Sequence, residues 1–205
     1  SAARYANPLT QLPGNVPINE HIDRMLEANT VFVAAYIDID SFKPYNDTYG
    51  YRRGDDVIQL LGNLICEAVD PRVDFVGHIG GDDFFVIFQS SDWERRCWGI
   101  VRSFDDLVAG MVNLNEHAQG GYLAENRKGE LVLQAFPTLS IGAVSVDSGE
   151  YESHREVAAA ASVAKKEAKK AGKKLPGERL AGRVFIERRR GRSEIGSSVP
   201  QSLLN

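Results

Sequence analysis

Cysteine is scarce in this sequence, which has two such residues, Cys66 and Cys97, among 205. Both fall within apolar patterns that are typical of helices. We therefore predict two buried, reduced thiols and a reducing, cytoplasmic location. The sequence gives no reason to expect a disulfide framework.

Long apolar runs and several known catalytic signatures are also missing. No run approaches the roughly 20 residues of a membrane-spanning helix and no signal peptide is visible, so we expect no membrane segment in this stretch of chain. The four histidines are scattered and are not paired at metal-binding spacing. There is no Gly-x-Ser-x-Gly elbow and no Walker phosphate loop, so these two catalytic devices are excluded.

Charge is distributed unevenly along the chain. Residues 1–164 hold 12 basic and 24 acidic residues, whereas residues 165–205 hold 12 basic and 4 acidic residues. An acidic body with a basic C-terminal helix favours a phosphate-bearing ligand bridged by a metal over a long nucleic-acid groove. We therefore expect no nucleic-acid partner.

Apolar periodicity predicts alternating helices and strands. The expected elements are a helix at about 18–28, a strand at 31–37, a helix at 57–68, a hairpin at 75–88, a helix from about 91, a hairpin at 122–134, a strand at 137–146, a lysine-rich helix from about 153 and a strand at 183–186. This order predicts an α/β (α+β) fold in which helices pack against a central sheet. We expect one domain at 1–187, followed by a flexible basic tail at 188–205.

A Gly-Gly-Asp-Asp turn is the first candidate for a functional site. Gly80 and Gly81 separate two apolar runs, and glycine tolerates the positive φ angle of a tight turn. Asp82 and Asp83 follow at the tip, where adjacent carboxylates repel each other unless a cation lies between them. Oxygen ligands without Cys or His favour a hard ion such as Mg²⁺. Taken alone, however, such a turn is more often a solvated acidic loop.

A second acidic feature lies earlier in the chain, where the apolar run at 31–37 leads into Asp38-Ile39-Asp40. If this strand lies beside the hairpin, Asp38 converges with Asp82 and Asp83. Together with the Ile39 carbonyl, the three carboxylates would form an oxygen cage for one or two metal ions. Such a cage is the equipment of nucleotidyl transfer, because metals bind the triphosphate and activate the attacking hydroxyl.

Four motifs occur in the order and spacing of a known family. They are Asn7-Pro-Leu-Thr-Gln-Leu-Pro, Asp38-Ile-Asp-Ser-Phe-Lys-Pro-Tyr-Asn-Asp-Thr-Tyr-Gly-Tyr-Arg-Arg-Gly-Asp55, Gly80-Gly-Asp-Asp-Phe84 and Thr138-Leu-Ser-Ile-Gly-Ala143. Together they resemble the GGDEF family of diguanylate cyclases, from about residue 7 to about residue 186. The resemblance implies the palm-like fold of nucleotide cyclases, with a central, mostly antiparallel sheet flanked by helices.

The resemblance also implies roles for individual residues. Asp38, Asp82 and Asp83 are the expected catalytic residues, and with the Ile39 carbonyl they are the expected ligands of Mg²⁺ (or Mn²⁺). The residues expected to bind GTP are Phe42, Lys43, Asn46, Asp55, Gly81, Lys169 and Lys173. Asn46 and Asp55 would read guanine, because a carboxylate can accept hydrogen bonds from the two adjacent N–H donors of that base. Lys169 and Lys173 would contact the β- and γ-phosphates.

The implied function is a diguanylate cyclase, which condenses two GTP into cyclic di-GMP and two pyrophosphates across a homodimer. An alternative is a GTP-binding regulatory domain with weak or lost activity that controls an attached domain such as EAL. Two departures motivate it: Asp83 replaces the longer Glu of the family, and Lys165 and Lys166 stand at positions that are usually apolar and aromatic. A third reading is a palm-type synthetase of cyclic oligonucleotides, but Asn46 and Asp55 argue for guanine over adenine.

Three further features depart from the family pattern. His78 stands where an Arg commonly precedes the glycines, and with the Gly-Gly-Asp-Asp form it resembles GGDEF domains attached to EAL and CBS modules. The family's product-inhibition motif, Arg-x-x-Asp, retains Asp74, but Pro71 occupies the Arg position. We therefore expect no product inhibition at that site. The hairpin at 122–134 is expected to be an addition to the minimal domain.

Overall fold

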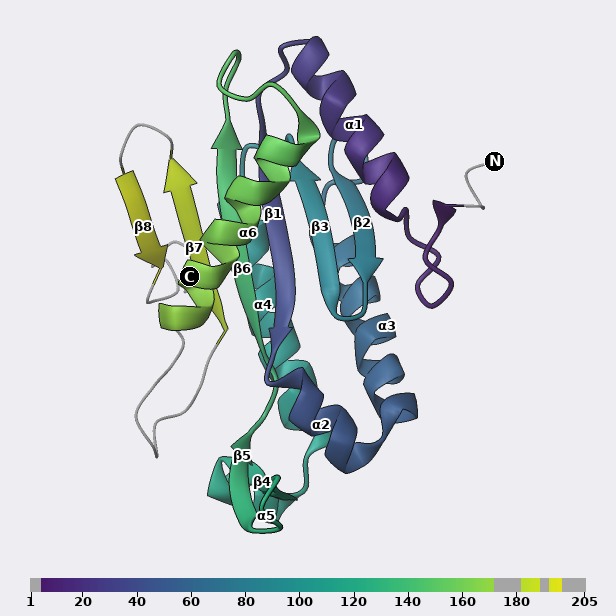
Figure 1. The fold of residues 1–205 in the computed structure, drawn as a ribbon, viewed down its shortest axis with the longest axis vertical. Coiled ribbons are helices and arrows are strands. Elements are labelled where there is room, and N and C mark those ends of the chain that lie inside the picture. Colours follow the sequence, from purple (N-terminus) through teal and green to yellow (C-terminus); the bar gives the residue numbers. More distant parts are fainter. Residues whose placement is uncertain (1–4, 172–181, 189–191, 197–205) are drawn as a thin grey trace.

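The structure is a computed structural model, and it describes residues 5–171, 182–188 and 192–196. Within these residues, helices cover both faces of a six-stranded sheet, and a two-stranded sheet lies beyond one end (Figure 1). The helices are α1 (Asn15–Glu27), α2 (Phe42–Tyr49), α3 (Tyr51–Ala68), α4 (Trp93–Met111), α5 (Leu114–Gln119) and α6 (His154–Ala171). The strands are β1 (Phe32–Asp40), β2 (Phe75–Gly80), β3 (Asp83–Phe88), β4 (Gly121–Glu125), β5 (Leu131–Ala135), β6 (Thr138–Val146), β7 (Arg183–Arg188) and β8 (Arg192–Gly196).

The central sheet has the strand order β2-β3-β1-β6-β7-β8. In the described part of the chain, β6 and β7 are parallel and the other neighbouring strands are antiparallel. This confirms the mostly antiparallel sheet that the family resemblance implies. β1 lies between β3 and β6 and is almost entirely buried, as expected for a strand with a continuous apolar run.

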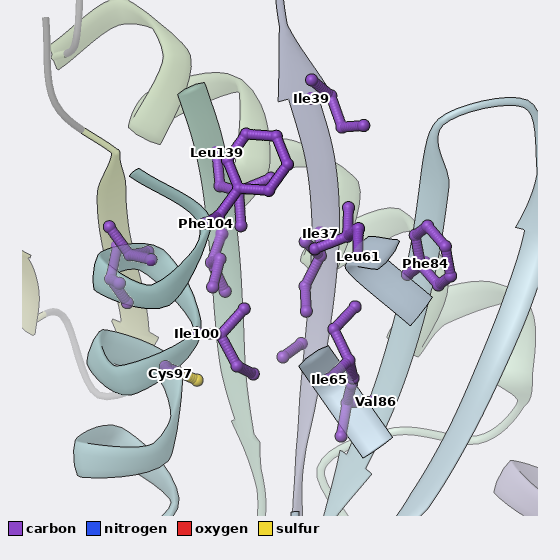
Figure 2. Close-up of a cluster of buried hydrophobic side chains, with 14 of the residues drawn as sticks. Ile37, Ile39, Leu61, Ile65, Phe84, Val86, Cys97, Ile100, Phe104 and Leu139 are labelled. Atoms are coloured by element: carbon purple, nitrogen blue, oxygen red, sulfur yellow. The ribbon is translucent and has the colours of Figure 1, made fainter. Parts of the chain in front are cut away.

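One face of the sheet packs against α3 and α4. Figure 2 shows this core, in which Leu61 and Ile65 of α3 and Ile100 and Phe104 of α4 meet Ile37 of β1. These five side chains are fully buried. Each recurs on one stripe of its helix or one face of its strand, which is why the periodicity in the sequence locates these elements correctly.

The other face of the sheet packs against α1 and α6. Helix α6 presents a stripe of small buried residues, Ala161, Ala164 and Ala168, to the sheet. Gly142 of β6 allows a still closer approach, because a Cβ at this position would lie 2.0 Å from the backbone nitrogen of Lys165. The helix backbone therefore rests directly on the sheet at Gly142.

β1 continues almost directly into α2, and Gly50 separates α2 from α3. The φ angle of Gly50 is 90°, a value that glycine adopts without strain. The elements expected from the sequence include no helix between the strand at 31–37 and the helix at 57–68, so α2 was not predicted. α3 begins at Tyr51, earlier than expected, so Asp55 lies near the beginning of that helix.

The hairpin expected at 122–134 forms the separate sheet β4–β5, after the short helix α5. Tyr122 is buried against Tyr49 of α2, with ring centroids 5.1 Å apart. The Tyr49 hydroxyl also donates to Glu116 of α5 over 2.8 Å. These contacts fix the segment of α5, β4 and β5 against α2. The outer leucines of this segment are exposed, namely Leu114, Leu123, Leu131 and Leu133.

The C-terminal region differs from the expected flexible tail at 188–205. Arg192–Gly196 forms β8, which is antiparallel to β7. In the sheet, β7 lies between β6 and β8. The backbone groups on the side of β7 that faces away from β6 pair with β8, so they do not form an unpaired sheet edge. The other residues of the expected tail, 189–191 and 197–205, lie outside the described residues.

The two cysteines are both free thiols but differ in exposure. Cys97 of α4 is buried, as predicted, and burial raises the pKa of its thiol. The prediction that Cys66 is buried is wrong, because this residue follows Ile65 on α3 and lies on the solvent side of that helix.

None of the helices in the described ranges combines the length and apolarity needed to cross a bilayer.

Candidate functional site

Three carboxylates converge where β1 passes the β2–β3 turn. Asp38 of β1 lies directly opposite Asp83 of β3 in the antiparallel register, and Asp82 is the adjacent residue of the turn. One carboxylate oxygen from each of the three residues lies within 4.8 Å of the others. The chain order alone cannot bring these acids together, whereas the pairing of β1 with β3 does.

Two lysines of α6 face this carboxylate cluster. Tyr36, Asp38 and Asp40 alternate along β1 and so share the sheet face that α6 covers. The Lys169 ammonium lies 2.5 Å from Asp38 Oδ2 and 3.4 Å from Asp40 Oδ1. The Lys165 ammonium lies 3.6 Å from the same Asp38 oxygen. Two of the lysines of the lysine-rich helix α6, Lys165 and Lys169, therefore point into the site.

Asp40 supports the site from β6. Its carboxylate accepts hydrogen bonds from the hydroxyls of Thr138, at 3.2 Å, and Ser140, at 2.7 Å. Burial raises the pKa of Asp40, although the Ser140 hydroxyl and the charge of Lys169 act in the opposite direction. Asp40 therefore ties the end of β1 to β6 and provides Lys169 with a second contact.

The charges of the cluster are only partly balanced. Burial, reinforced by the charge of Asp38, raises the pKa of Asp82 to about 7. Burial, together with contact with Asp38, also raises the pKa of Asp83 to about 6. For Asp38 itself, burial acts to raise the pKa, but hydrogen bonds from Lys169 and Asp83 and the charges of the lysines lower it overall. Three close carboxylates, two of which have raised pKa values, fit a divalent cation with a preference for oxygen.

Tyr36 and Lys165 are residues of this site that the sequence reasoning does not assign. The Tyr36 hydroxyl donates to Asp83 Oδ2 over 3.1 Å. The sequence contains a signal for Tyr36, because it precedes Asp38 by two positions and alternate residues of a strand lie on the same face. The signal for Lys165 is its spacing of four residues from Lys169, which places the two lysines next to each other on one face of α6.

His78 holds the turn that carries Asp82. Gly80 and Gly81 in this turn have φ angles of 144° and 54°. The His78 Nε2 lies 2.9 Å from the Gly81 carbonyl oxygen, and because a carbonyl only accepts, Nε2 donates. Nδ1 then accepts from the Thr10 hydroxyl at 2.8 Å. The neutral ring of His78 therefore connects the N-terminal segment to the acidic turn.

The substitution His78→Phe should lower stability by about 2 kcal/mol at pH 7.5, because two buried hydrogen bonds are lost while stacking on Phe84 is kept. Burial lowers the pKa of His78, so the folded protein disfavours the protonated ring. The contribution of the neutral ring is complete above the unfolded pKa of about 6.5 and is lost as the pH falls through the folded pKa. Urea unfolding at pH 7.5 and pH 5 should give a smaller difference between the two proteins at the lower pH. An equal difference at both would contradict a neutral, buried His78.

Asn46 and Asp55, the expected guanine-reading residues, lie close to the α2–α3 junction. The Asn46 Oδ1 atom is buried and has no hydrogen-bond partner among the described residues. It lies against Gly54, where a Cβ would be 1.7 Å from this oxygen. Asp55 follows Gly54 and is exposed on α3. The fold leaves the hydrogen-bonding capacity of the Asn46 oxygen unused among the described residues, and the Asp55 carboxylate faces solvent.

The remaining expected substrate residues lie around the end of β1. Phe42 is buried at the first turn of α2, and Lys43 is exposed beside it. The first N–H groups of a helix lack intrahelical acceptors, so this end of α2 suits a phosphate. The Ile39 side chain is buried in the core opposite the carboxylates, and Gly81 is exposed in the turn. Lys173 lies outside the described residues.

Asp74, at the expected product-inhibition position, is engaged within the protein. Its carboxylate accepts hydrogen bonds from the backbone nitrogens of Asp70 at 2.8 Å, Gln89 at 2.9 Å and Ser90 at 3.0 Å. It also accepts one from the Ser90 hydroxyl at 2.9 Å. Asp74 therefore fixes the two loops around β2 and β3. The absence of product inhibition at this position stays a prediction.

Solved structures share this fold. The diguanylate cyclase SiaD from Pseudomonas aeruginosa, solved with its activator SiaC, aligns with a TM-score of 0.63 and 21% identity over 91% of this chain and 63% of that chain. The GGDEF domain of DgcB from Caulobacter crescentus, solved with c-di-GMP, aligns with a TM-score of 0.57 and 23% identity over 87% of this chain and 93% of that chain. These similarities confirm the fold expected from the sequence.

Sequence relatives point to the same family. Diguanylate cyclase DgcP of Escherichia coli is 27% identical over 71% of this chain and 39% of that protein, and DgcZ of the same organism is 34% identical over 46% of this chain and 32% of that protein. The matched regions therefore span two fifths or less of the length of these relatives. The family model for the diguanylate cyclase GGDEF domain matches residues 5–119, more than half of the 205 residues. The chain thus belongs to the GGDEF family of diguanylate cyclases.

Proposed function

We propose that this chain is an active diguanylate cyclase, which condenses two GTP into cyclic di-GMP with release of two pyrophosphates. The convergence of Asp38, Asp82 and Asp83 within 4.8 Å, facing Lys169 of α6, is the observation that supports the proposal most. Carboxylates for a metal and a cation for phosphate, placed together, are the components of phosphoryl-transfer sites.

The carboxylates of Asp38, Asp82 and Asp83, with the Ile39 carbonyl, would hold Mg²⁺ or Mn²⁺. The donor set fits such an ion, because it consists of oxygens alone and the carboxylates of Asp82 and Asp83 have raised pKa values. When bound, the cation would supply Lewis acidity that stabilises charge on the phosphate and activates the attacking hydroxyl.

The base of GTP would lie at the α2–α3 junction. The exposed Asp55 carboxylate can accept from both N–H donors on the Watson–Crick edge of guanine, whereas adenine offers one donor and one acceptor on the same edge. The Asn46 amide, which has no hydrogen-bond partner for its oxygen among the described residues, would make the second contact with the base. This pair therefore selects GTP over ATP in the proposal.

The triphosphate would run from α2 toward α6. Backbone N–H groups at Phe42 and in the turn at Gly81, together with the Lys43 charge, would bind its oxygens. Lys169 is half-buried and would exchange its contact with Asp38 for a phosphate. Lys173, one helical turn later in the sequence, is proposed to bind a further phosphate oxygen.

Each reaction step joins two nucleotides held by two copies of the domain. The 3′-hydroxyl oxygen of one GTP attacks the α-phosphorus of the other, forming an O–P bond. The bond from that phosphorus to the oxygen bridging the β-phosphate breaks, and pyrophosphate leaves with the electron pair. The Asp82 carboxylate, with its pKa raised to about 7, would accept the hydroxyl proton or hold the cation. A second, symmetric step closes the ring.

Incubation with GTP and Mg²⁺ or Mn²⁺ tests the proposal. The purified chain, at increasing concentration, should form cyclic di-GMP, identified by chromatography and mass spectrometry. The rate should rise more than linearly with protein concentration, because two domains must meet. ATP serves as the matched control and should give no cyclic product. Binding of GTP without any product would overturn the cyclase proposal and would favour a regulatory GTP-binding domain.

A further inference from the structure

Lys165 is a largely buried cation beside the carboxylate cluster, and the proposed reaction does not use it. Its side chain is 13% exposed, compared with 36% for that of Lys169, one turn later on α6. The Lys165 ammonium lies 3.6 Å from Asp38 Oδ2. Lysine is rarely buried to this extent without a partner for its charge. Asp38 is this charge partner for Lys165.

The packing of α6 determines where Lys165 points. Gly142 is the direct neighbour of Tyr36 across the β1–β6 pairing. The Lys165 backbone rests on Gly142, since a Cβ there would approach its nitrogen to 2.0 Å. The side chain of Lys165 therefore begins at the sheet surface, next to Tyr36. Its ammonium lies 4.1 Å from the centroid of the Tyr36 ring, within cation–π distance.

Tyr36 connects Lys165 to a second carboxylate. Its hydroxyl donates to Asp83 Oδ2 over 3.1 Å, and its ring meets Phe85 edge-on with centroids 6.0 Å apart. Tyr36 is therefore held by a hydrogen bond at its tip and a ring contact on its flank. Lys165 is placed on the face of a fixed ring, and its positive charge acts on both Asp38 and Asp83.

We propose that Lys165 is a fixed cation that takes the place of a second divalent ion in this site. The inference rests on the proposed function only in treating the carboxylate cluster as the metal site. When ionised, Asp40 and the three carboxylates of the cluster carry four negative charges, and the ammonium groups of Lys165 and Lys169 offset two of them. A single divalent cation then balances the remaining two, so the nucleotide-free site binds one ion.

The number of Mn²⁺ ions bound by the nucleotide-free chain tests this proposal, with free Mn²⁺ measured by electron paramagnetic resonance. The wild-type chain should bind one ion at the site. Lys165→Met keeps the length of the side chain, removes its charge and should bind two, the first about tenfold more tightly. Lys166→Met, on the exposed side of α6, is the matched control and should bind one. Two ions in the wild type, or one ion in both Lys165→Met and the wild type, would overturn the proposal.

A stability measurement separates this role from simple packing. Without metal, Lys165→Met should melt at a lower temperature than the wild type, because Asp38 and Asp83 lose a charge partner. Saturating Mn²⁺ should raise its melting temperature more than that of the wild type. Lys165→Gln, a second uncharged variant, should behave in the same way. A lower melting temperature with an unchanged response to Mn²⁺ would contradict the proposal. Neither readout requires GTP turnover, so a failure of the cyclase assay leaves both tests valid.

Discussion

The substitution Asp82→Asn should reduce cyclic di-GMP formation by at least about 100-fold while the protein stays folded. Asp82 lies in the β2–β3 turn and is not part of either apolar core. Its amide replacement keeps the size of the side chain. It can neither hold a divalent cation as a carboxylate does nor accept a proton from the attacking hydroxyl. Activity and stability should therefore respond in different directions.

The stability change has a predictable sign. Burial raises the folded pKa of Asp82 to about 7, so its contribution to stability is complete below the unfolded pKa and is lost as the pH rises through about 7. Without metal, Asp82→Asn should therefore stabilise the protein more at pH 8 than at pH 5. Thermal melts at both pH values measure this. Asp147→Asn, at an exposed position after β6, is the matched control and should change neither activity nor the melts. Product formation by Asp82→Asn at a near wild-type rate would contradict the assignment of Asp82 as a catalytic residue and metal ligand.

The substitution Gly54→Ala should raise the KM for GTP by about 10- to 100-fold. A Cβ at Gly54 would lie 1.7 Å from the Asn46 Oδ1 and 2.8 Å from its Cγ, so the Asn46 side chain has to move. The atoms that the new methyl group meets belong to this side chain and not to the backbone, so the α2–α3 junction itself can persist. Loss of one well-placed contact with the base accounts for an effect of this size.

The control for this prediction is Gly99→Ala in α4. Gly99 is also a helical glycine, but a Cβ there meets nothing within 4 Å among the described residues. Replacement of a helical glycine by alanine alone stabilises a helix by up to about 1 kcal/mol, so the control should be slightly more stable with an unchanged KM. Steady-state kinetics with GTP and urea unfolding provide both readouts. If KM stays unchanged in a folded Gly54→Ala protein, Asn46 does not bind the base.

The elements of the central fold were predictable from local patterns. The apolar run before Asp38 identifies β1, and the glycines of the acidic turn identify the β2–β3 hairpin, because burial and turn geometry act over a few neighbouring residues. The strand Arg192–Gly196 was not predictable in this way. Its sequence has little apolar content, and it forms as a partner for the open edge of β7.

The functional site was predictable only in part. The pairing of Asp38 with Asp83 depends on which strand β1 chooses as its neighbour, so the motifs suggest it but residue spacing cannot establish it. Lys165 belongs to a column of lysines on α6, and such columns are usually solvated surface. Its burial results from the close approach of α6 at Gly142, a tertiary contact that has no signal in the local sequence. The contact of Tyr36 with Asp83 follows only once β1 is placed beside β3, because both residues then share one face of the sheet.

The central claim is that Asp38, Asp82 and Asp83 form the metal site at which GTP reacts. Crystals of the chain grown with Mn²⁺ and a non-hydrolysable GTP analogue test it most directly, through the anomalous scattering of the ion. The predicted result is an ion roughly 2.0 to 2.6 Å from carboxylate oxygens of Asp38 and Asp82 and beside the triphosphate, with guanine against Asn46 and Asp55. An ion located away from the three carboxylates, or a nucleotide bound elsewhere on the protein, would contradict the claim.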